Sequence, residues 1–409
     1  MAKKTLKDVD LKNKKVIIRV DYNVPINGGK VTSNKRIVAS LPTIQYALKQ
    51  NAAVILLSHL GRVESLEDVT NGKKSLAPVV KELKKLLPKV NVKFVDKSVG
   101  TIVENSVKEL KPGEILLLEN TRYNDVDEKG KEVKKESKND KVLGAYWAKL
   151  GDVFVNDAFG TAHRNAASNT GIASAIKTSC VGFLIQLELE NLAKITEKPK
   201  HPVVAILGGS KVSDKLAIIE NLIKISDKIL IVGGMANTFL TAQGQNMGSS
   251  KVESDLIATA KAILKKDTKH KIVLPVDFLT SKEFKDVKPQ PKSIGDDFSG
   301  LMALDIGKKS IDLFAKELES AKTVFWNGPA GVFEFANYAY GTKQICNVLK
   351  TISKKGTFTL IGGGDSAAAA LSLGFKESDF GFISTGGGAS LEFIEGKVLP
   401  GVASIQEKK

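Results

Sequence analysis

Short apolar segments recur along the whole chain, each with the length of a strand in a buried parallel sheet. In the first half they cover residues 15–20, 53–57, 92–95, 115–118 and 153–155. In the second half they cover residues 203–207, 229–232, 272–274, 324–326 and 358–361, and a further one ends at Ile383. Stretches with apolar residues at helical spacing lie between them, most clearly at residues 76–87. This alternation predicts an α/β fold with a parallel sheet in each half.

Polar and cationic side chains follow the apolar segments of the first half directly. In chain order they are Asp21, Asn23, His59, Arg62, Arg122, His163 and Arg164. Because the carboxyl ends of parallel strands share one edge of a sheet, we expect these side chains to gather on one rim. The segment between residues 124 and 141 is highly charged with little apolar content, which predicts a surface excursion.

Glycines follow five of the six apolar segments in the second half. The fullest example is FTLIGGGDSAAAAL at residues 358–371, which predicts a strand, a glycine turn and a helix with Asp365 or Ser366 as its N-cap. Backbone N–H groups and the helix dipole favour an anion at such a turn, and Asp365 is placed to hold a magnesium ion. The same residues equally fit an ordinary strand-to-helix turn.

The two halves meet in a stretch of different character. Residues 181–195 have helical periodicity, and KPKHP follows at residues 198–202 as a cluster of helix breakers. We therefore expect an N-terminal lobe over residues 1–180, an interdomain helix and linker over residues 181–200, and a C-terminal lobe over residues 201–397.

The composition argues against a disulfide-rich or zinc-binding protein and indicates an anion site. Two cysteines far apart in sequence favour neither a disulfide framework nor a zinc site, and the absence of a signal peptide or a long apolar run predicts a cytoplasmic address. The net charge is +16, yet only five of the 61 basic residues are arginines, and all lie within the first 164 residues: Arg19, Arg36, Arg62, Arg122 and Arg164. A guanidinium binds carboxylate or phosphate bidentately, which lysine cannot do, so the arginines together indicate an anion site.

The motifs favour phosphoryl transfer. The chain has no P-loop, no complete dinucleotide fingerprint, no HExxH and no GxSxG. A basic nucleic-acid-binding protein is the alternative, but aromatic residues make up 6% of the chain and no nucleic-acid recognition motif occurs. In phosphoryl transfer, positioning and charge neutralisation supply most of the catalysis, and a rim of cations in one half with bare glycine loops in the other suits it.

Eight motifs in order resemble those of the phosphoglycerate kinase family along essentially the whole chain. In the first half they are RVDYNVP at 19–25, SHLGR at 58–62, LLLENTRY at 116–123 and FVNDAFGTAHR at 154–164. In the second half they are LGGSKVSDK at 207–215, WNGPAGVFE at 326–334, IGGGDS at 361–366 and STGGGASLE at 384–392.

The resemblance implies two Rossmann-like lobes, each a parallel sheet flanked by helices, joined by a hinge helix, with the tail 398–409 packed on the N-terminal lobe. It implies reversible, magnesium-dependent in-line transfer between 1,3-bisphosphoglycerate and ADP, giving 3-phosphoglycerate and ATP in glycolysis. A cytoplasmic monomer with no membrane partner and no specific nucleic acid is expected.

The resemblance also implies site residues. Phosphoglycerate would bind Asp21, Asn23, Arg36, His59, Arg62, Arg122, His163 and Arg164. Nucleotide would bind Lys211, Lys215, Glu334, Gly363, Gly364, Asp365 and Ser366, with Asp365 on magnesium. Arg36, Lys211 and Gly387 would stabilise the group in transfer.

Five positions depart from the usual family pattern. Val63 and Lys308 stand where proline is common, Ala166 stands where a histidine is common, and Gln186-Leu187 replaces a charged pair. None of them removes an expected ligand, but Ala166 leaves open the contribution of a second histidine.

Overall fold

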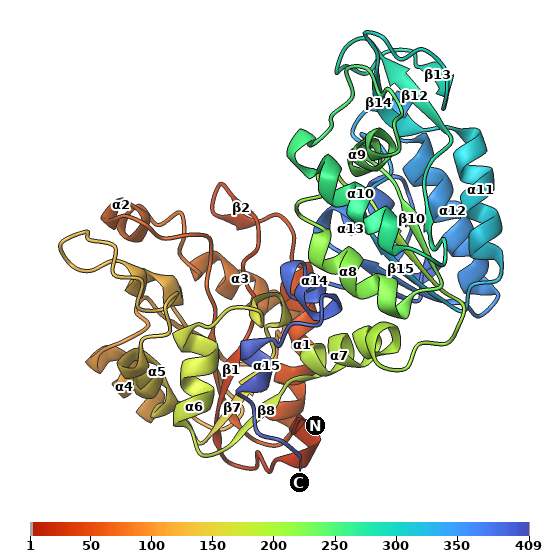
Figure 1. The fold of residues 1–409 in the computed structure, drawn as a ribbon. Coiled ribbons are helices and arrows are strands. Elements are labelled where there is room, and N and C mark those ends of the chain that lie inside the picture. The colour runs from red at the N-terminus through yellow and green to blue at the C-terminus, as the bar shows by residue number, and fades with distance from the viewer. Residues whose placement is uncertain (1–2, 409) are drawn as a thin grey trace. The chain divides into compact units, whose positions relative to one another are not determined.

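The computed structural model describes residues 3–408, which form two compact units (Figure 1). The N-terminal unit comprises the chain up to Leu189 together with the tail from Val398 onward. The C-terminal unit is Glu190–Lys397. The division between the units falls inside helix α7, which spans Phe183–Thr196.

The N-terminal unit is built on a six-stranded parallel sheet in the order β5-β6-β4-β1-β7-β8. Its strands are β1 (Lys15–Arg19), β4 (Ala53–Leu57), β5 (Val92–Val95), β6 (Ile115–Leu118), β7 (Val153–Asn156) and β8 (Ser179–Val181). The chain leaves β1 toward β4 on one side and returns to β7 on the other. The direction of winding therefore reverses beside β1, where open α/β sheets place their ligands.

The C-terminal unit has a second six-stranded parallel sheet in the order β11-β10-β9-β15-β16-β17. Its strands are β9 (Val203–Leu207), β10 (Lys228–Ile231), β11 (Ile272–Val273), β15 (Thr323–Asn327), β16 (Phe358–Gly362) and β17 (Phe382–Ile383). This is the strand order of dinucleotide-binding folds, with the switch point between β9 and β15.

Helices flank each sheet. In the N-terminal unit they are α1 (Lys35–Lys49), α2 (Leu66–Thr70), α3 (Ala77–Leu86), α4 (Thr101–Lys108), α5 (Lys141–Ala148), α6 (Ile172–Ala175) and α15 (Pro400–Ala403). In the C-terminal unit they are α8 (Leu216–Ile225), α9 (Gly234–Ala242), α10 (Ile257–Lys266), α11 (Lys308–Glu319), α12 (Tyr340–Lys354), α13 (Gly364–Ser372) and α14 (Gly388–Ile394). Within that unit α9 packs against α10, and α11 lies beside α12 (Figure 1).

The apolar pattern predicts the parallel sheets because their strands are buried on both faces. Every residue of β4, β6, β9 and β15 is buried. The first three are continuous apolar runs, and β15 is apolar between its terminal residues Thr323 and Asn327. The pattern does not predict the antiparallel sheet β13-β12-β14, formed by Gln290–Ser293, Asp277–Ser281 and Met302–Ile306. In β12 and β14 some positions are only partly buried, β13 has no buried position, and all three strands contain polar residues. The two-stranded hairpin β2–β3 (Ile26–Asn27 and Lys30–Val31) is short and partly polar.

The expectation that residues 124–141 form a surface excursion is wrong in part. Asp125, Val126 and Glu136 within this segment are buried, and Ser137 donates backbone and hydroxyl hydrogen bonds to Asp125. A charged sequence without apolar periodicity carries no signal that one of its carboxylates turns inward.

The tail from Val398 onward packs on the N-terminal unit through hydrogen bonds to the backbone of Gly401. The Gly401 N–H donates to the Ala162 carbonyl at 2.8 Å, and Asn156 Nδ2 donates to the Gly401 carbonyl at 2.8 Å. A Cβ on Gly401 would lie 3.1 Å from Ala162, which accounts for glycine at this close approach.

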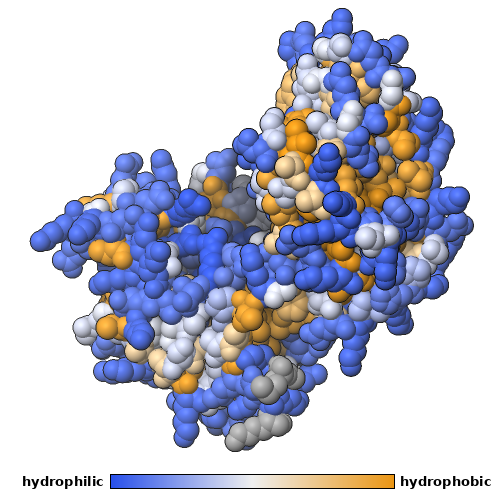
Figure 2. Space-filling view, in the orientation of Figure 1, coloured by the Kyte–Doolittle hydropathy of each residue, from blue (hydrophilic) through white to orange (hydrophobic). Residues whose placement is uncertain are grey.

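The surface visible in Figure 2 is largely hydrophilic, as expected of a lysine-rich chain, with smaller apolar patches over the C-terminal unit. Among residues 3–408, no helix combines the length and the apolar character that crossing a lipid bilayer requires.

A buried carboxylate caps helix α7. Asp157, directly after β7, accepts hydrogen bonds from the N–H groups of Leu184 at 2.9 Å and Ile185 at 3.4 Å, while Thr43 Oγ1 accepts from Phe183 N at 2.9 Å. Burial of the charged form raises the pKa of Asp157 to about 7. The first turn of α7 is thus held to the N-terminal unit by a carboxyl group that is costly to ionise.

This capping arrangement predicts a pH-dependent effect of Asp157→Asn. In the unfolded chain the carboxyl ionises near its ordinary value of 3.8, whereas the folded protein keeps the proton until about pH 7. Wild-type stability should therefore fall relative to Asp157→Asn between those pH values, by about 4 kcal/mol in all and about 2–3 kcal/mol between pH 5 and 7, and the difference should then level off. Urea unfolding from pH 5 to 8, followed by Trp147 fluorescence in a Trp326→Phe background, measures it. A pH-independent difference would contradict this account.

Candidate functional site

In the N-terminal unit, the loops after β1, β4 and β6 meet at Gly61. The Gly61 N–H donates to Asn23 Oδ1 at 2.9 Å, and its carbonyl accepts from Arg122 Nη1 at 2.5 Å. Arg62, next in the chain, is exposed. Three strand ends predicted to share one rim are thus joined by direct hydrogen bonds.

Arg36 approaches the same rim from the first turn of α1. Its Nη1 lies 2.7 Å from Asp21 Oδ2, while Asp21 Oδ1 accepts from Asn23 N at 3.2 Å. The Asp21 side chain is largely buried, whereas that of Arg36 is 41% exposed, so one end of the guanidinium is held and the rest faces solvent. The pair orients Arg36 before any ligand arrives.

His59 lies below this rim, 4% exposed, at the end of β4. Burial lowers its pKa well below the ordinary value, and the positive charges of Arg19, Arg122, Arg164 and Arg36 lower it further. His59 is therefore a neutral imidazole at physiological pH, despite its cationic surroundings.

A cavity of about 240 Å³ connects His59 with two more of the predicted residues, Arg122 and Arg164. His163 adjoins Arg164, whose Nε lies 3.4 Å from His163 Nε2. Ala166, where the resemblance leads us to expect a histidine, also lines the cavity with a small side chain beside the arginines. Val63, another position that departs from the expected pattern, is buried, with 3% of its surface exposed.

In the C-terminal unit, the glycine loops after β9 and β15 pack backbone against backbone at the switch point. A Cβ on Gly208 would overlap the Gly328 and Pro329 carbonyls, and a Cβ on Gly328 would overlap the Gly208 carbonyl. Gly328 also has φ +94°, a conformation that other residues rarely adopt. The two loops can pack this closely because Gly208 and Gly328 have no side chains.

The third glycine loop, after β16, is joined to the same place. Gly363, with φ +89°, is the N-cap of α13, and the helix begins at Gly364. The expectation that Asp365 or Ser366 caps α13 is therefore wrong. Ser366 instead accepts a hydrogen bond from the Gly328 N–H at 2.6 Å, while Asp365 lies exposed in the first turn. A left-handed turn needed glycine at the cap, which left the polar side chains free for other contacts.

These loops enclose a pocket of about 280 Å³. Its lining contains most of the expected nucleotide residues and all of those expected to meet the transferred group apart from Arg36: Lys211, Lys215, Gly363, Gly364, Asp365, Ser366 and Gly387. Lys215 Nζ donates to Asn327 Oδ1, and burial lowers the pKa of Lys215 while Asp214 and Asp365 oppose that shift. Lys211 is exposed.

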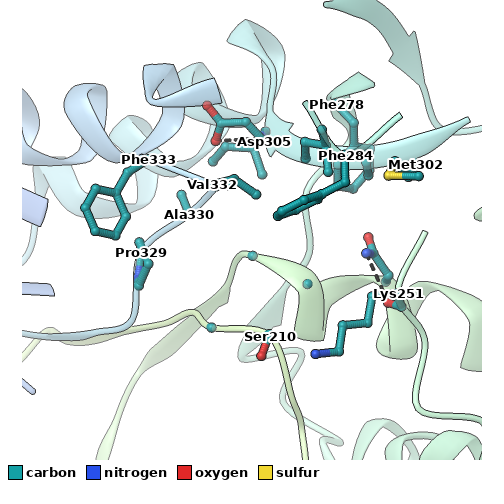
Figure 3. Close-up of a pocket in the computed structure, with 18 of the residues that line it drawn as sticks. Ser210, Lys251, Phe278, Phe284, Met302, Asp305, Pro329, Ala330, Val332 and Phe333 are labelled. Carbon is teal, nitrogen blue, oxygen red and sulfur yellow. Dashed lines mark hydrogen bonds between the residues drawn. The ribbon is translucent and has the colours of Figure 1, made fainter. Parts of the chain in front are cut away.

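A second pocket of about 490 Å³ shares Gly209, Ser210, Pro329 and Asp365 with the first. Its walls are mainly apolar, and the side chains of Phe284 and Val332 lie across it from Ser210 and Lys251 (Figure 3). Glu334 lines this pocket rather than the first. The two together suit a ligand with an apolar, planar part and a polyanionic part.

Sequence reasoning missed several residues that support these pockets. Glu253 accepts from the N–H groups of Val212 and Ser213 and from Ser213 Oγ at 2.7 Å, so it holds the loop that carries Lys211 and Lys215. Phe278 and Met302, which belong to the unpredicted antiparallel sheet, supply part of the apolar wall. Neither feature has a local motif.

Comparison with known proteins gives one consistent result. The sequence profile described as "Phosphoglycerate kinase" matches residues 6–397. A protein named phosphoglycerate kinase from Listeria innocua is 55% identical over 409 residues, covering 100% of both chains. The solved phosphoglycerate kinase from Coxiella burnetii is similar with a TM-score of 0.87 and 37% identity, covering 98% of each chain. That from Pyrococcus horikoshii has a TM-score of 0.80 and 30% identity, covering 99% of this chain and 98% of its own.

The backbone contact at the switch point predicts that Gly328→Ala is strongly destabilising. The new Cβ meets the Gly208 carbonyl in addition to the unfavourable φ, so we expect a loss of about 2–4 kcal/mol in unfolding free energy. Gly374→Ala is the matched control, because Gly374 has φ +87° with nothing within 4 Å of an added Cβ. It should lose about 1 kcal/mol. Equal losses in urea unfolding would show that the contact contributes nothing.

Proposed function

Because the chain belongs to the phosphoglycerate kinase family, we propose that it transfers a phosphoryl group reversibly between 1,3-bisphosphoglycerate and ADP, giving 3-phosphoglycerate and ATP. It is a phosphotransferase with a carboxyl group as acceptor, and the reaction is a step of glycolysis. The observation that carries the proposal is that each unit gathers groups that suit an anion. In the N-terminal unit these are guanidinium groups around His59, and in the C-terminal unit they are glycine loops with two lysines.

We assign the phosphoglycerate to the rim of the N-terminal unit. Its phosphate and carboxylate would be bound among Asp21, Asn23, Arg36, His59, Arg62, Arg122, His163 and Arg164. The arginine side chains offer paired N–H donors to a planar or tetrahedral anion. A neutral His59 adds a hydrogen bond without adding a charge that the surrounding arginines would repel.

We assign the nucleotide to the two connected pockets of the C-terminal unit. The base would lie in the apolar pocket, and Glu334 would hydrogen-bond the ribose. The phosphates would meet the backbone N–H groups of Gly363 and Gly364, Asp365 and Ser366 in the first turn of α13, and Lys215. Lys211 and Gly387 would meet the group in transfer.

Magnesium would be held by Asp365. This carboxylate is exposed beside the phosphate pocket, and no cluster of three metal-binding side chains occurs within residues 3–408. A single carboxylate fits Mg²⁺, which takes one or two protein carboxylates together with substrate phosphates. The bound ion would neutralise phosphate charge.

The proposed reaction is direct, in-line transfer with no phospho-enzyme, so catalysis consists of positioning and of neutralising charge on the transferring group. Arg36, oriented by Asp21, would stabilise charge at the acceptor carboxyl. Because donor and acceptor must meet with water excluded, we propose that the two units close during turnover, with α7 as the hinge. We also propose a cytoplasmic monomer, on the basis of the family alone.

The test is a coupled assay with 3-phosphoglycerate and MgATP, comparing wild type with Arg36→Lys. Wild type should turn over both substrates. Arg36→Lys keeps the charge but loses the planar fork, so kcat should fall by about 100-fold or more, while the KM for MgATP changes little. Lys49→Gln, at the exposed end of the same helix, should match wild type. No turnover by the wild type would refute the function, and full turnover by Arg36→Lys would refute this role.

Asp365→Ala tests the assignment of magnesium. Losing the carboxylate should weaken MgADP binding by about 10-fold or more and leave 3-phosphoglycerate binding unchanged, because the two ligands are assigned to different units. Isothermal titration calorimetry with each ligand measures both affinities. Unchanged MgADP affinity would contradict the assignment.

A further inference from the structure

Glu136 is a buried carboxylate in the charged segment between β6 and α5. Its Oε2 accepts a hydrogen bond from the Ser168 N–H at 2.9 Å, and its Oε1 accepts from Ser168 Oγ and, at 3.2 Å, from Thr121 Oγ1. Its own carbonyl accepts from Ala167 N at 2.9 Å. The side chain is 2% exposed, and both carboxylate oxygens are occupied by donors.

Ser168 connects this carboxylate to a buried arginine. Arg19, the last residue of β1, donates from Nε to Ser168 Oγ at 2.7 Å and from Nη1 to the Val20 carbonyl at 2.5 Å. A hydroxyl has one proton, so Ser168 gives its proton to Glu136 and accepts from Arg19. Arg19 Nη2 also lies 4.0 Å from Glu136 Oε1, which makes a buried ion pair.

The remaining arm of Arg19 reaches His59. Nη2 lies 3.2 Å from His59 Nδ1. A guanidinium has donors and no acceptor, so His59 Nδ1 must be the unprotonated nitrogen in this contact. The neutral ring then carries its proton on Nε2. His59 lines the cavity that also contains Arg122 and Arg164.

Charge compensation makes the network interdependent. Arg19 is completely buried, and burial lowers its pKa while the charge of Glu136 opposes that shift. Burial likewise raises the pKa of Glu136, and Arg19 opposes it. Removing the carboxylate would leave a buried guanidinium without a counter-charge, and such a group moves or draws in water.

We propose that Glu136 is a positioning residue, which acts through Ser168 and Arg19 to hold His59 in the tautomer protonated at Nε2. His59 can then donate a hydrogen bond from Nε2 to the anionic substrate. The identity of that substrate rests on the proposed function, whereas the state of the imidazole does not depend on it.

The experiment measures the ring of His59 directly in Glu136→Gln. Long-range ¹H–¹⁵N spectra of protein labelled at histidine report which ring nitrogen is protonated, and His59→Gln assigns its signals among the four histidines. Wild type should show Nε2 protonated and Nδ1 bare. Neither orientation of the glutamine amide introduced by Glu136→Gln can accept from every donor that the carboxylate satisfies, so the variant should populate the other tautomer.

The same variant has a kinetic consequence. The kcat/KM for 3-phosphoglycerate should fall about 10- to 100-fold, whereas the KM for MgATP should stay within about twofold of wild type. Glu132→Gln is the matched control, because Glu132 is in the same segment with an exposed side chain paired to Lys134. It should leave both the spectra and the kinetics unchanged.

A milder variant, Ser168→Ala, removes the hydroxyl that connects Glu136 to Arg19 and leaves Glu136 in place. If Glu136→Gln does not fold, the His59 signals of Ser168→Ala test the proposal. Wild-type His59 signals in folded Glu136→Gln or Ser168→Ala would overturn the proposal. If the wild type lacked phosphoglycerate kinase activity but the His59 tautomer still differed between wild type and the two variants, the proposed function would fail and the positioning role would stand.

Discussion

The burial of both faces of each parallel sheet is the constraint on which the rest of this structure depends. Helices cover the sheets, so a polar side chain within β4, β6 or β9, or in the middle of β15, would have no route to water. Chemistry is confined to the loops that leave the carboxyl edges. All main-sheet strands are parallel, so these edges coincide within each unit, and residues far apart in sequence converge without any long-range signal of their own.

The two units use different groups at these carboxyl edges: side chains in the N-terminal unit and backbone in the C-terminal unit. In the N-terminal unit, guanidinium and carboxylate side chains project from the strand ends, and backbone atoms such as those of Gly61 hold them in place. In the C-terminal unit, side chains are absent where the loops after β9 and β15 approach, and the pocket is built around exposed backbone. A few guanidinium groups can bind the carboxylate and phosphate of a small acid bidentately. A polyphosphate is longer and is better matched by successive backbone N–H groups.

The sequence predicts these features unequally, for physical reasons. The apolar pattern predicts the bounds of the parallel core strands to within one or two residues, because a strand that is buried on both faces consists of consecutive apolar residues. The sheet β13-β12-β14 and the short β8 are missed, because half-exposed or three-residue strands leave no such run. Motifs locate the residues that project from strand ends. They do not locate Glu253 or Glu136, whose roles depend on which distant loop each carboxylate meets.

Arg19 qualifies the inference that arginines in a lysine-rich chain mark an anion site. Arg36, Arg122 and Arg164 fit it, because each faces the rim or its cavity. The guanidinium N–H groups of Arg19 instead contact Ser168, Val20 and His59, all within the protein. Lysine would fail there too, since one ammonium on a flexible stem cannot hold three acceptors in a fixed plane. Arginine is thus retained for geometry in both places, once toward a ligand and once toward the histidine that would meet it.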